Sequence, residues 1–172
     1  METQKLNTLK TMLFLLAVPG FVLFVVPVTF ILPVEKNAID LGLFAWAALP
    51  LWVSGLAILL WCAIDFVRTG KGTPIPVDPP KVLVIGGLYR YVRNPMYLGV
   101  LTVAAGQALW RGSPFLFGYV LLLWGAFQTF ILLYEEPHLR KTFGQAYRDY
   151  CQTVPRWLPR LKHAARKNEK QP

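Results

Sequence analysis

Four runs of apolar residues, separated by polar segments, organise this chain. They cover residues 11–32, 41–64, 97–110 and 114–134, and none of them contains a charged residue. The first, second and fourth runs are about 21 to 24 residues long, the length that a helix needs to cross a bilayer. The third run is only about 14 residues long and is marginal as a full span. The pattern therefore predicts an all-α integral membrane protein with about four transmembrane helices.

The connection between the third and fourth runs is the short turn sequence Arg111-Gly112-Ser113-Pro114. Helices joined by so short a connection usually lie antiparallel to each other. Residues 97–135 are therefore predicted to form a transmembrane helical hairpin. Two further membrane helices are expected within residues 1–67.

Residues 68–96 form a Pro/Gly-rich segment between the second and third runs. Its prolines prevent a regular helix, so we expect a cytoplasmic loop that extends along the membrane face. Asn94 and Pro95 should begin the third helix, since a proline in the first helical turn loses no hydrogen bond. The free N–H groups of that turn favour an anionic group.

The segment after the fourth run is predicted to be an amphipathic helix. Pro137 is expected to kink or restart the helix, because proline lacks a backbone N–H. Four large side chains then recur at helical spacing: Leu139, Phe143, Tyr147 and Tyr150. Residues 136–160 should therefore form a cytoplasmic helix and a basic segment at the membrane surface. The polar, basic tail, residues 161–172, is expected to be disordered.

The distribution of charge orients these helices in the membrane. The formal net charge is +9, and most cations precede the first run, lie in the 68–96 loop or follow the fourth run. The opposite side carries few charged residues: Glu35, Lys36, Asp40 and Arg111. The positive-inside rule therefore places both termini and the loop in the cytoplasm, in a multi-pass protein of the cell (inner) membrane. Because the rule accounts for most of the cations, no nucleic-acid binding is expected.

Charged side chains at the ends of the predicted hairpin are the candidate functional residues. Arg93 precedes the third run, and Glu135 and Glu136 follow the fourth. Carboxylates are unfavourable at a helix C-terminus, where the dipole is already negative, so the pair needs partners. Neighbouring helical residues point about 100° apart, so at most one of the two faces a given pocket directly. An arginine and a carboxylate held together there can bind a small molecule that carries both signs of charge.

Structural roles are also open for several of these residues. Arg93 can act as a positive-inside anchor, and Tyr97 can belong to the interfacial aromatic belt. His138 is compatible with a structural role as well as with acid–base catalysis. The two cysteines, Cys62 and Cys151, lack the spacing of a metal site or a disulfide framework, and no metal is expected.

Three segments resemble the isoprenylcysteine carboxyl methyltransferase family, which is related to the membrane phospholipid methyltransferases. They are residues 87–99 (GLYRYVRNPMYLG), the pair Glu135-Glu136, and residues 143–156, which begin with FGQAYRDY and end with VPR. The resemblance covers roughly residues 70–160. It implies S-adenosylmethionine as methyl donor, bound in a cytoplasmic pocket that the C-terminal segment closes. It also implies a lipophilic or lipid-linked acceptor that reaches the site from the membrane lipids.

The resemblance assigns roles to individual residues. The expected catalytic residues are Arg93, Glu135 and Glu136. The expected cofactor-binding residues are Tyr89, Val92, Arg93, Asn94, Pro95, Tyr97, Leu98, Glu135, Glu136, His138, Tyr147 and Tyr150. The chemistry agrees, because the sulfonium and ammonium of S-adenosylmethionine suit Glu135 or Glu136 and its carboxylate suits Arg93.

Two positions depart from the family's pattern. Asn94 stands where many relatives have histidine, and Ile131 stands where eukaryotic carboxyl methyltransferases carry an arginine for the substrate. The resemblance therefore supports the cofactor more than it supports an isoprenylcysteine acceptor. The alternative is a phospholipid, or another small molecule methylated on nitrogen or sulfur. A carboxylate acceptor would need no general base, whereas an amine would need one, with Glu136, His138 and Tyr147 as candidates.

Other classes of protein fit this sequence less well. A non-catalytic membrane scaffold of the same fold would not need the arginine and the acidic pair, and both are present. A small transporter would call for ionisable groups within the spans, and the four runs lack them. A soluble-type methyltransferase is excluded, because the sequence has no Gly-rich strand–helix unit.

Overall fold

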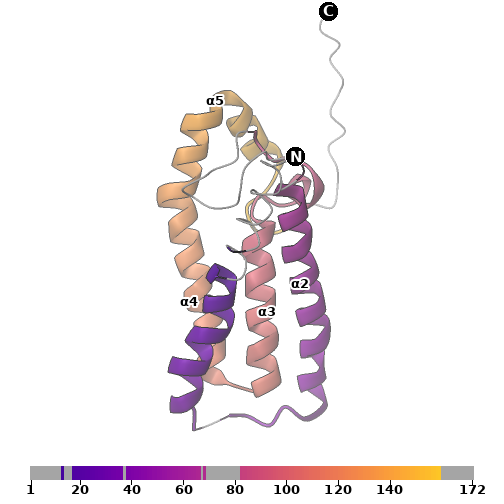
Figure 1. Ribbon diagram of the computed structural model, residues 1–172, viewed down its shortest axis with the longest axis vertical. Coiled ribbons are helices and arrows are strands. Elements are labelled where there is room, and N and C mark those ends of the chain that lie inside the picture. Colours follow the sequence, from indigo (N-terminus) through magenta and orange to yellow (C-terminus); the bar gives the residue numbers. More distant parts are fainter. Residues whose placement is uncertain (1–12, 14–16, 37, 67, 69–81, 160–172) are drawn as a thin grey trace, which may run out of the picture.

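The computed structural model describes residues 13, 17–36, 38–66, 68 and 82–159. Every regular element in these residues is helical. Figure 1 shows the N-terminal helix, α2, α3 and α4 running along one long axis, with α5 at one end of the bundle. The all-α architecture expected from the apolar runs is therefore confirmed for this part of the chain.

The elements follow one another along the chain with short connections. The N-terminal helix covers Ala17–Val34 and includes the π-helical turns η1 (Phe21–Val25) and η2 (Pro27–Ile31) and the 3₁₀ turn η3 (Leu32–Val34). It is followed by η4 (Gly42–Ala47), α2 (Ala48–Asp65), η6 (Gly87–Arg90), α3 (Pro95–Arg111) and α4 (Pro114–Phe130). α4 continues through the π-helical turn η7 (Ile131–Glu135) into α5 (Glu136–Thr153).

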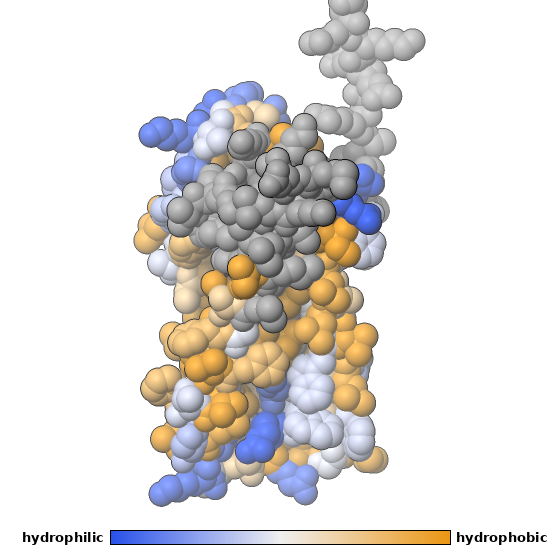
Figure 2. Space-filling model, viewed as in Figure 1, coloured by the Kyte–Doolittle hydropathy of each residue, from blue (hydrophilic) through white to orange (hydrophobic). Residues whose placement is uncertain are grey.

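The surface of the molecule is that of a multi-pass membrane protein. Within the described residues, three helical stretches are long and apolar enough to cross a bilayer: Ala17–Val34, Gly42–Asp65 and Pro114–Thr153. On the face shown in Figure 2, apolar residues cover much of the helical shaft and hydrophilic residues gather toward its two ends. α3 has 17 residues and is shorter than these stretches.

Prolines distort the N-terminal helix, and polar side chains from the hairpin compensate. Pro27 has no N–H to donate to the carbonyl of Leu23, four residues earlier. Gln107 Nε2 of α3 donates to that carbonyl at 2.8 Å instead. Tyr119 of α4 likewise donates its hydroxyl to the carbonyl of Val22 at 2.8 Å. In an apolar bundle such replacement donors make a broken helix tolerable.

Glycines bring α2 and α3 into close contact. A Cβ at Gly55 would lie 2.7 Å from Val103 Cγ2 and 2.9 Å from the carbonyl oxygen of Gly99. A Cβ at Gly106 would lie 2.6 Å from Cδ1 of Trp52. Small residues let membrane helices approach closely and pack through van der Waals contact. This contact fixes α3, and with it the residues at its N-terminus, against α2.

The predicted hairpin of α3 and α4 is confirmed. Gly112 ends α3 in the left-handed conformation, with φ 56°. The side chain of Ser113 then caps α4 by accepting from the backbone N–H of Leu116 at 3.0 Å, and Pro114 occupies the first turn. Glycine at the end of one helix and serine-proline at the start of the next is a favourable sequence for such a turn.

Of the two outcomes expected at Pro137, a kink or a restart, the structure shows the restart, and the chain bends elsewhere. The helix first widens into the π-turn η7, in which the N–H of Glu136 bonds to the carbonyl of Ile131. α5 then begins at Glu136 with Pro137 in its first turn, where a missing N–H is tolerated. The bend lies within α5 at Gly144, where φ is 54° and ψ is −124°. Only glycine adopts this conformation readily.

Candidate functional site

The loop that leads into α3 connects α2 with α5. Tyr89 packs its ring edge-on against Phe66 at the end of α2, with 5.7 Å between the ring centroids. Its backbone carbonyl accepts a hydrogen bond of 2.6 Å from the hydroxyl of Tyr150. Val92 is 5% exposed and anchors the loop in the interior. The candidate residues of the loop are therefore held next to those of the C-terminal helix.

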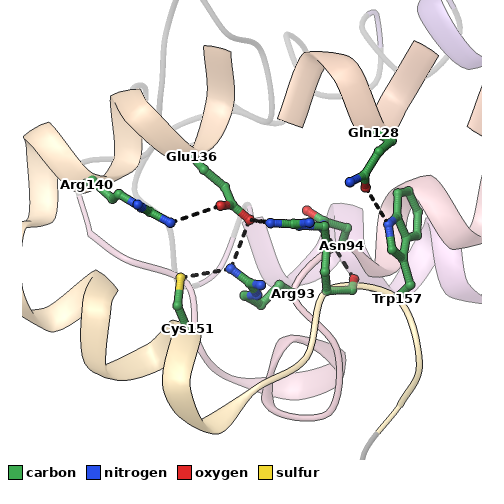
Figure 3. Close-up of polar contacts among 8 residues, drawn as sticks. Arg93, Asn94, Gln128, Glu136, Arg140, Cys151 and Trp157 are labelled. Carbon is green, nitrogen blue, oxygen red and sulfur yellow. Dashed lines mark hydrogen bonds and ion pairs between the residues drawn. The ribbon is translucent and has the colours of Figure 1, made fainter. Parts of the chain in front are cut away.

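Arg93 lies at the centre of this junction. Its Nη1 donates to Glu136 Oε1 at 2.9 Å and to Cys151 Sγ at 2.9 Å, and its side chain is 12% exposed (Figure 3). Burial lowers the pKa of Arg93, but Glu136, Cys151 and Tyr147 together outweigh this and the pKa lies above its ordinary value. Its Nε is buried and has no hydrogen-bond partner. The guanidinium is thus permanently charged and retains an unused donor at Nε.

Glu136 is surrounded by cations. Its Oε1 accepts from Arg93 and also from Arg156, whose Nη2 lies 2.8 Å away. Its Oε2 pairs with Arg140 Nη2 at 3.3 Å (Figure 3). Glu136 itself is only 4% exposed. A buried carboxylate needs such partners, and three arginines saturate this one.

Glu135 has different partners from its neighbour. Its Oε2 accepts a hydrogen bond of 2.9 Å from the hydroxyl of Tyr97. Tyr97 is held in turn by Phe127 of α4, with 4.7 Å between the ring centroids. Among the described residues, no cation pairs with Glu135. The half-buried carboxylate is therefore oriented but not neutralised.

The start of α3 meets the segment that follows α5. Residues 154–157, here called the C-terminal strap, pass beside Arg93 and Asn94. The backbone N–H of Arg93 donates to the carbonyl of Pro155 at 2.9 Å, and Asn94 Nδ2 donates to the carbonyl of Arg156 at 3.3 Å. Pro95 is fully buried in the first turn of α3. Leu98 donates its backbone N–H to the carbonyl of Asn94 at 3.2 Å.

The aromatic residues predicted on α5 do form one cluster. Tyr147, Tyr150 and Val154 are buried together, and four further side chains pack against them: Leu83, Leu139, Phe143 and Cys151. Because Gly144 bends α5, the two arms of the helix fold toward each other and this cluster lies between them. His138 lies elsewhere: it is exposed, and its ring stacks on Tyr134 with 6.2 Å between the ring centroids.

The structure thus brings together most of the predicted site residues. Arg93 and Glu136 form the centre, and the loop, the start of α3 and the second arm of α5 surround them. Sequence reasoning missed Arg156 and Cys151 as members of this network, although the VPR segment contributed to the family resemblance. Neither was singled out by its charge at a helix end or by the motif residues, so only their position in the fold reveals their contacts. Among the described residues, no group of His, Cys, Asp or Glu side chains could hold a metal ion.

Comparison with known proteins identifies the family. The family model described as phospholipid methyltransferase matches residues 43–146. A probable protein-S-isoprenylcysteine O-methyltransferase from Oryza sativa subsp. indica is 38% identical over 78 residues, which are 45% of this chain and 40% of that protein. A phosphatidylethanolamine N-methyltransferase from Laccaria bicolor is 28% identical over 133 residues, 76% of this chain and 14% of that protein. A Delta(14)-sterol reductase from Gallus gallus is 32% identical over 87 residues, 47% of this chain and 13% of that protein.

These matches cover 40% or less of each of the three relatives. No solved structure matches this chain significantly. The family model, by contrast, spans more than half of the chain and includes Arg93, Glu135 and Glu136. The chain therefore belongs to the phospholipid methyltransferase family, a group of integral membrane S-adenosylmethionine-dependent methyltransferases that includes isoprenylcysteine O-methyltransferases.

Proposed function

We propose that this protein transfers a methyl group from S-adenosylmethionine to a small lipophilic or lipid-linked acceptor at the cytoplasmic face of the cell membrane. One observation carries the proposal. Glu135 is a half-buried carboxylate that Tyr97 orients and that no described cation neutralises, whereas Glu136, the next residue, pairs with three arginines. An oriented carboxylate without a cation is suited to bind a cationic ligand.

The charges present fit S-adenosylmethionine. This cofactor carries an ammonium and a sulfonium, which Glu135 would bind, and a carboxylate, which Arg93 would bind through its unpartnered Nε. The N–H groups at the start of α3 add a favourable dipole for the carboxylate. Loop residues Tyr89 and Val92, and Tyr147 and Tyr150 of α5, would complete the pocket walls.

When bound, S-adenosylmethionine supplies an activated methyl group. The contribution of the protein is then to orient the acceptor toward that group and to exclude water, since methyl transfer is an in-line displacement. The bent α5, with its apolar cluster, is placed to cover the site on the cytoplasmic side. Glu135, at the end of η7, and Arg93, in the loop before α3, would fix the two ends of the amino-acid part of the cofactor.

The described side chains favour an acceptor that needs no general base. Of the three candidates for that role, Glu136 is saturated by arginines, His138 is exposed and apart from the network, and Tyr147 is only 4% exposed within the apolar cluster. A carboxylate acceptor requires no base and is the first candidate. A phospholipid amine or another small molecule methylated on nitrogen or sulfur is the second, and the similarity to a phosphatidylethanolamine N-methyltransferase supports it.

The proposed topology has four spans, with both termini in the cytoplasm. α3 is apolar and packs between α2 and α4, but its 17 residues make a helix only about 25 Å long, shorter than the roughly 30 Å of a bilayer core. The site at its N-terminal end would then lie slightly within the membrane. An acceptor would reach it sideways from the bilayer, since α5 covers the other side.

Calorimetric binding of S-adenosylmethionine to the purified protein in detergent tests this proposal. We expect a dissociation constant in the micromolar range. Arg93→Ala and Glu135→Ala should each weaken binding by about 2–5 kcal/mol, because each removes one partner of a partly desolvated charge pair. Arg148→Ala, which removes an exposed cation from the nearby helix α5, is the control and should bind as the parent does. Unchanged binding by both site variants would place the cofactor elsewhere.

A further inference from the structure

We propose that Arg156 is a positioning residue for the cofactor site, and that it acts through Glu136 on Arg93. This inference rests on the proposed function, since it assigns Arg93 to the cofactor. Arg156 itself belongs to the C-terminal strap, residues 154–157, and not to any helix. Its guanidinium is the ionic contact that ties the strap to the centre of the site.

The strap is fixed to the bundle at several points. Its backbone carbonyls accept from Arg93 and Asn94 at the start of α3. At its far end, Trp157 Nε1 donates to Gln128 Oε1 of α4 at 2.7 Å (Figure 3). The ring of Trp157 also lies 6.3 Å from that of Trp124. The strap therefore bridges α3 and α4 beside the residues that we assign to the cofactor.

The ionic contact is shared with Arg93. Nε and Nη2 of Arg156 lie 2.9 Å and 2.8 Å from Glu136 Oε1, the same oxygen that accepts from Arg93 Nη1 at 2.9 Å. Because both guanidiniums converge on one carboxylate oxygen, the orientation of that carboxylate depends on both. Removing Arg156 would let the Glu136 carboxylate rotate and would loosen Arg93, whose Nε must point at the ligand.

Arg140 provides a matched comparison on the same carboxylate. It contacts the other oxygen, Oε2, at a longer distance of 3.3 Å, and its side chain is 56% exposed against 23% for Arg156. An exposed pair within one helix contributes little. Arg140→Ala should therefore remove one charge near Glu136 without moving the strap or Arg93.

The expected effect of Arg156→Ala is on cofactor binding more than on the maximal rate. At metal sites of other proteins, losing a residue that orients a ligating side chain lowers affinity or activity by about 10- to 100-fold. Arg156 orients Arg93 in the same indirect way, so we expect the KM and Kd for S-adenosylmethionine to rise by a similar factor. The kcat at saturating cofactor should change little. A purely structural defect would do the reverse, because a smaller folded fraction lowers the apparent kcat and leaves KM unchanged. Arg156→Lys, which keeps the charge but not the two converging donors, should be intermediate.

A second readout needs no cofactor. Cys151 is half-buried and accepts from Arg93 Nη1, whereas the other cysteine, Cys62, is fully buried in α2. In the full-length protein in detergent, Arg156→Ala should increase the rate of Cys151 modification by a maleimide several-fold. Arg140→Ala should leave that rate unchanged. Cys151→Ser identifies the part of the signal that comes from this thiol.

The outcomes separate this inference from the proposed function. Weaker cofactor binding and faster Cys151 labelling in Arg156→Ala, with neither in Arg140→Ala, support the positioning role. Parental binding and labelling by Arg156→Ala would overturn it, and so would equal effects of the two substitutions. If the parent protein does not bind S-adenosylmethionine, the proposed function fails. The labelling rates then decide alone whether Arg156 holds the strap and Arg93 in place.

Discussion

Glu135 and Glu136 are neighbours in the chain but have different environments. Glu136 is 4% exposed and pairs with Arg93, Arg140 and Arg156, so its main role is to hold these cations together. Among the residues that the structure describes, Glu135 is held by Tyr97. The sequence predicted that only one of the two would face a given pocket, from the 100° step between helical neighbours. It could not predict which one, because that depends on where the strap and Arg156 lie in space.

The stability of the protein should therefore respond differently to the two glutamates. Glu136→Gln leaves buried arginines without their carboxylate, and breaking a buried ion pair in this way typically costs about 3–5 kcal/mol. Glu135→Gln keeps an oxygen that can accept from Tyr97 and should cost about 1 kcal/mol or less. Unfolding of both variants by denaturant in detergent measures the difference. A loss for Glu136→Gln as small as the one expected for Glu135→Gln would mean that the arginine network contributes little to the stability of the fold.

Among the helical elements, α5 departs most from its expected form. The residues of its apolar face were predicted correctly, but the reason that they meet is the bend at Gly144 and not helical periodicity alone. At Pro137 the helix restarts, one of the two expected outcomes, after the π-turn η7. A glycine that bends a helix cannot be recognised from the sequence when other glycines, such as Gly118 and Gly125, lie within a regular helix.

Substitution of Gly144 tests the importance of the bend. Gly144→Ala forces a side chain into a conformation with φ 54° and ψ −124°, which should cost about 1–3 kcal/mol of folding free energy. It should also weaken cofactor binding, since the second arm of α5 carries Tyr147 and Tyr150. Gly118→Ala is the control, because a Cβ there meets no atom within 4 Å. Thermal unfolding in detergent measures the stability of the two variants. A Gly144→Ala variant as stable as Gly118→Ala would show that the bend is not required.

At the scale of the whole molecule, hydrophobic patterning predicted the architecture well. The apolar runs at 41–64 and 114–134 became α2 and α4, and the turn sequence at Gly112 joined α3 to α4 as expected. What the pattern could not predict is the course of residues 154–157 over the bundle. Trp157 contacts Gln128 and Trp124 on α4. Such contacts between distant segments have no periodic signal, because they depend on the assembled bundle.

The topology makes a prediction about accessibility. In a variant without native cysteines, a single cysteine at Arg148 on α5 should be protected from a membrane-impermeant thiol reagent in intact cells. A cysteine at Arg111, in the turn at the opposite end of the bundle, should react readily. Both positions are exposed in the structure, so burial would not explain a difference. Labelling at Arg148 and protection at Arg111 would reverse the orientation that the positive-inside rule gives.

The transfer of a labelled methyl group tests the central claim most directly. Membranes that contain the protein are incubated with S-adenosylmethionine carrying a radioactive methyl group, and the lipid extract and the aqueous fraction are counted separately. The account predicts label in the lipid extract for the parent, far less for Glu135→Gln, and parental labelling for Arg148→Ala. Label that appears only in water-soluble products, or equal labelling by Glu135→Gln at saturating cofactor and matched protein levels, would contradict it.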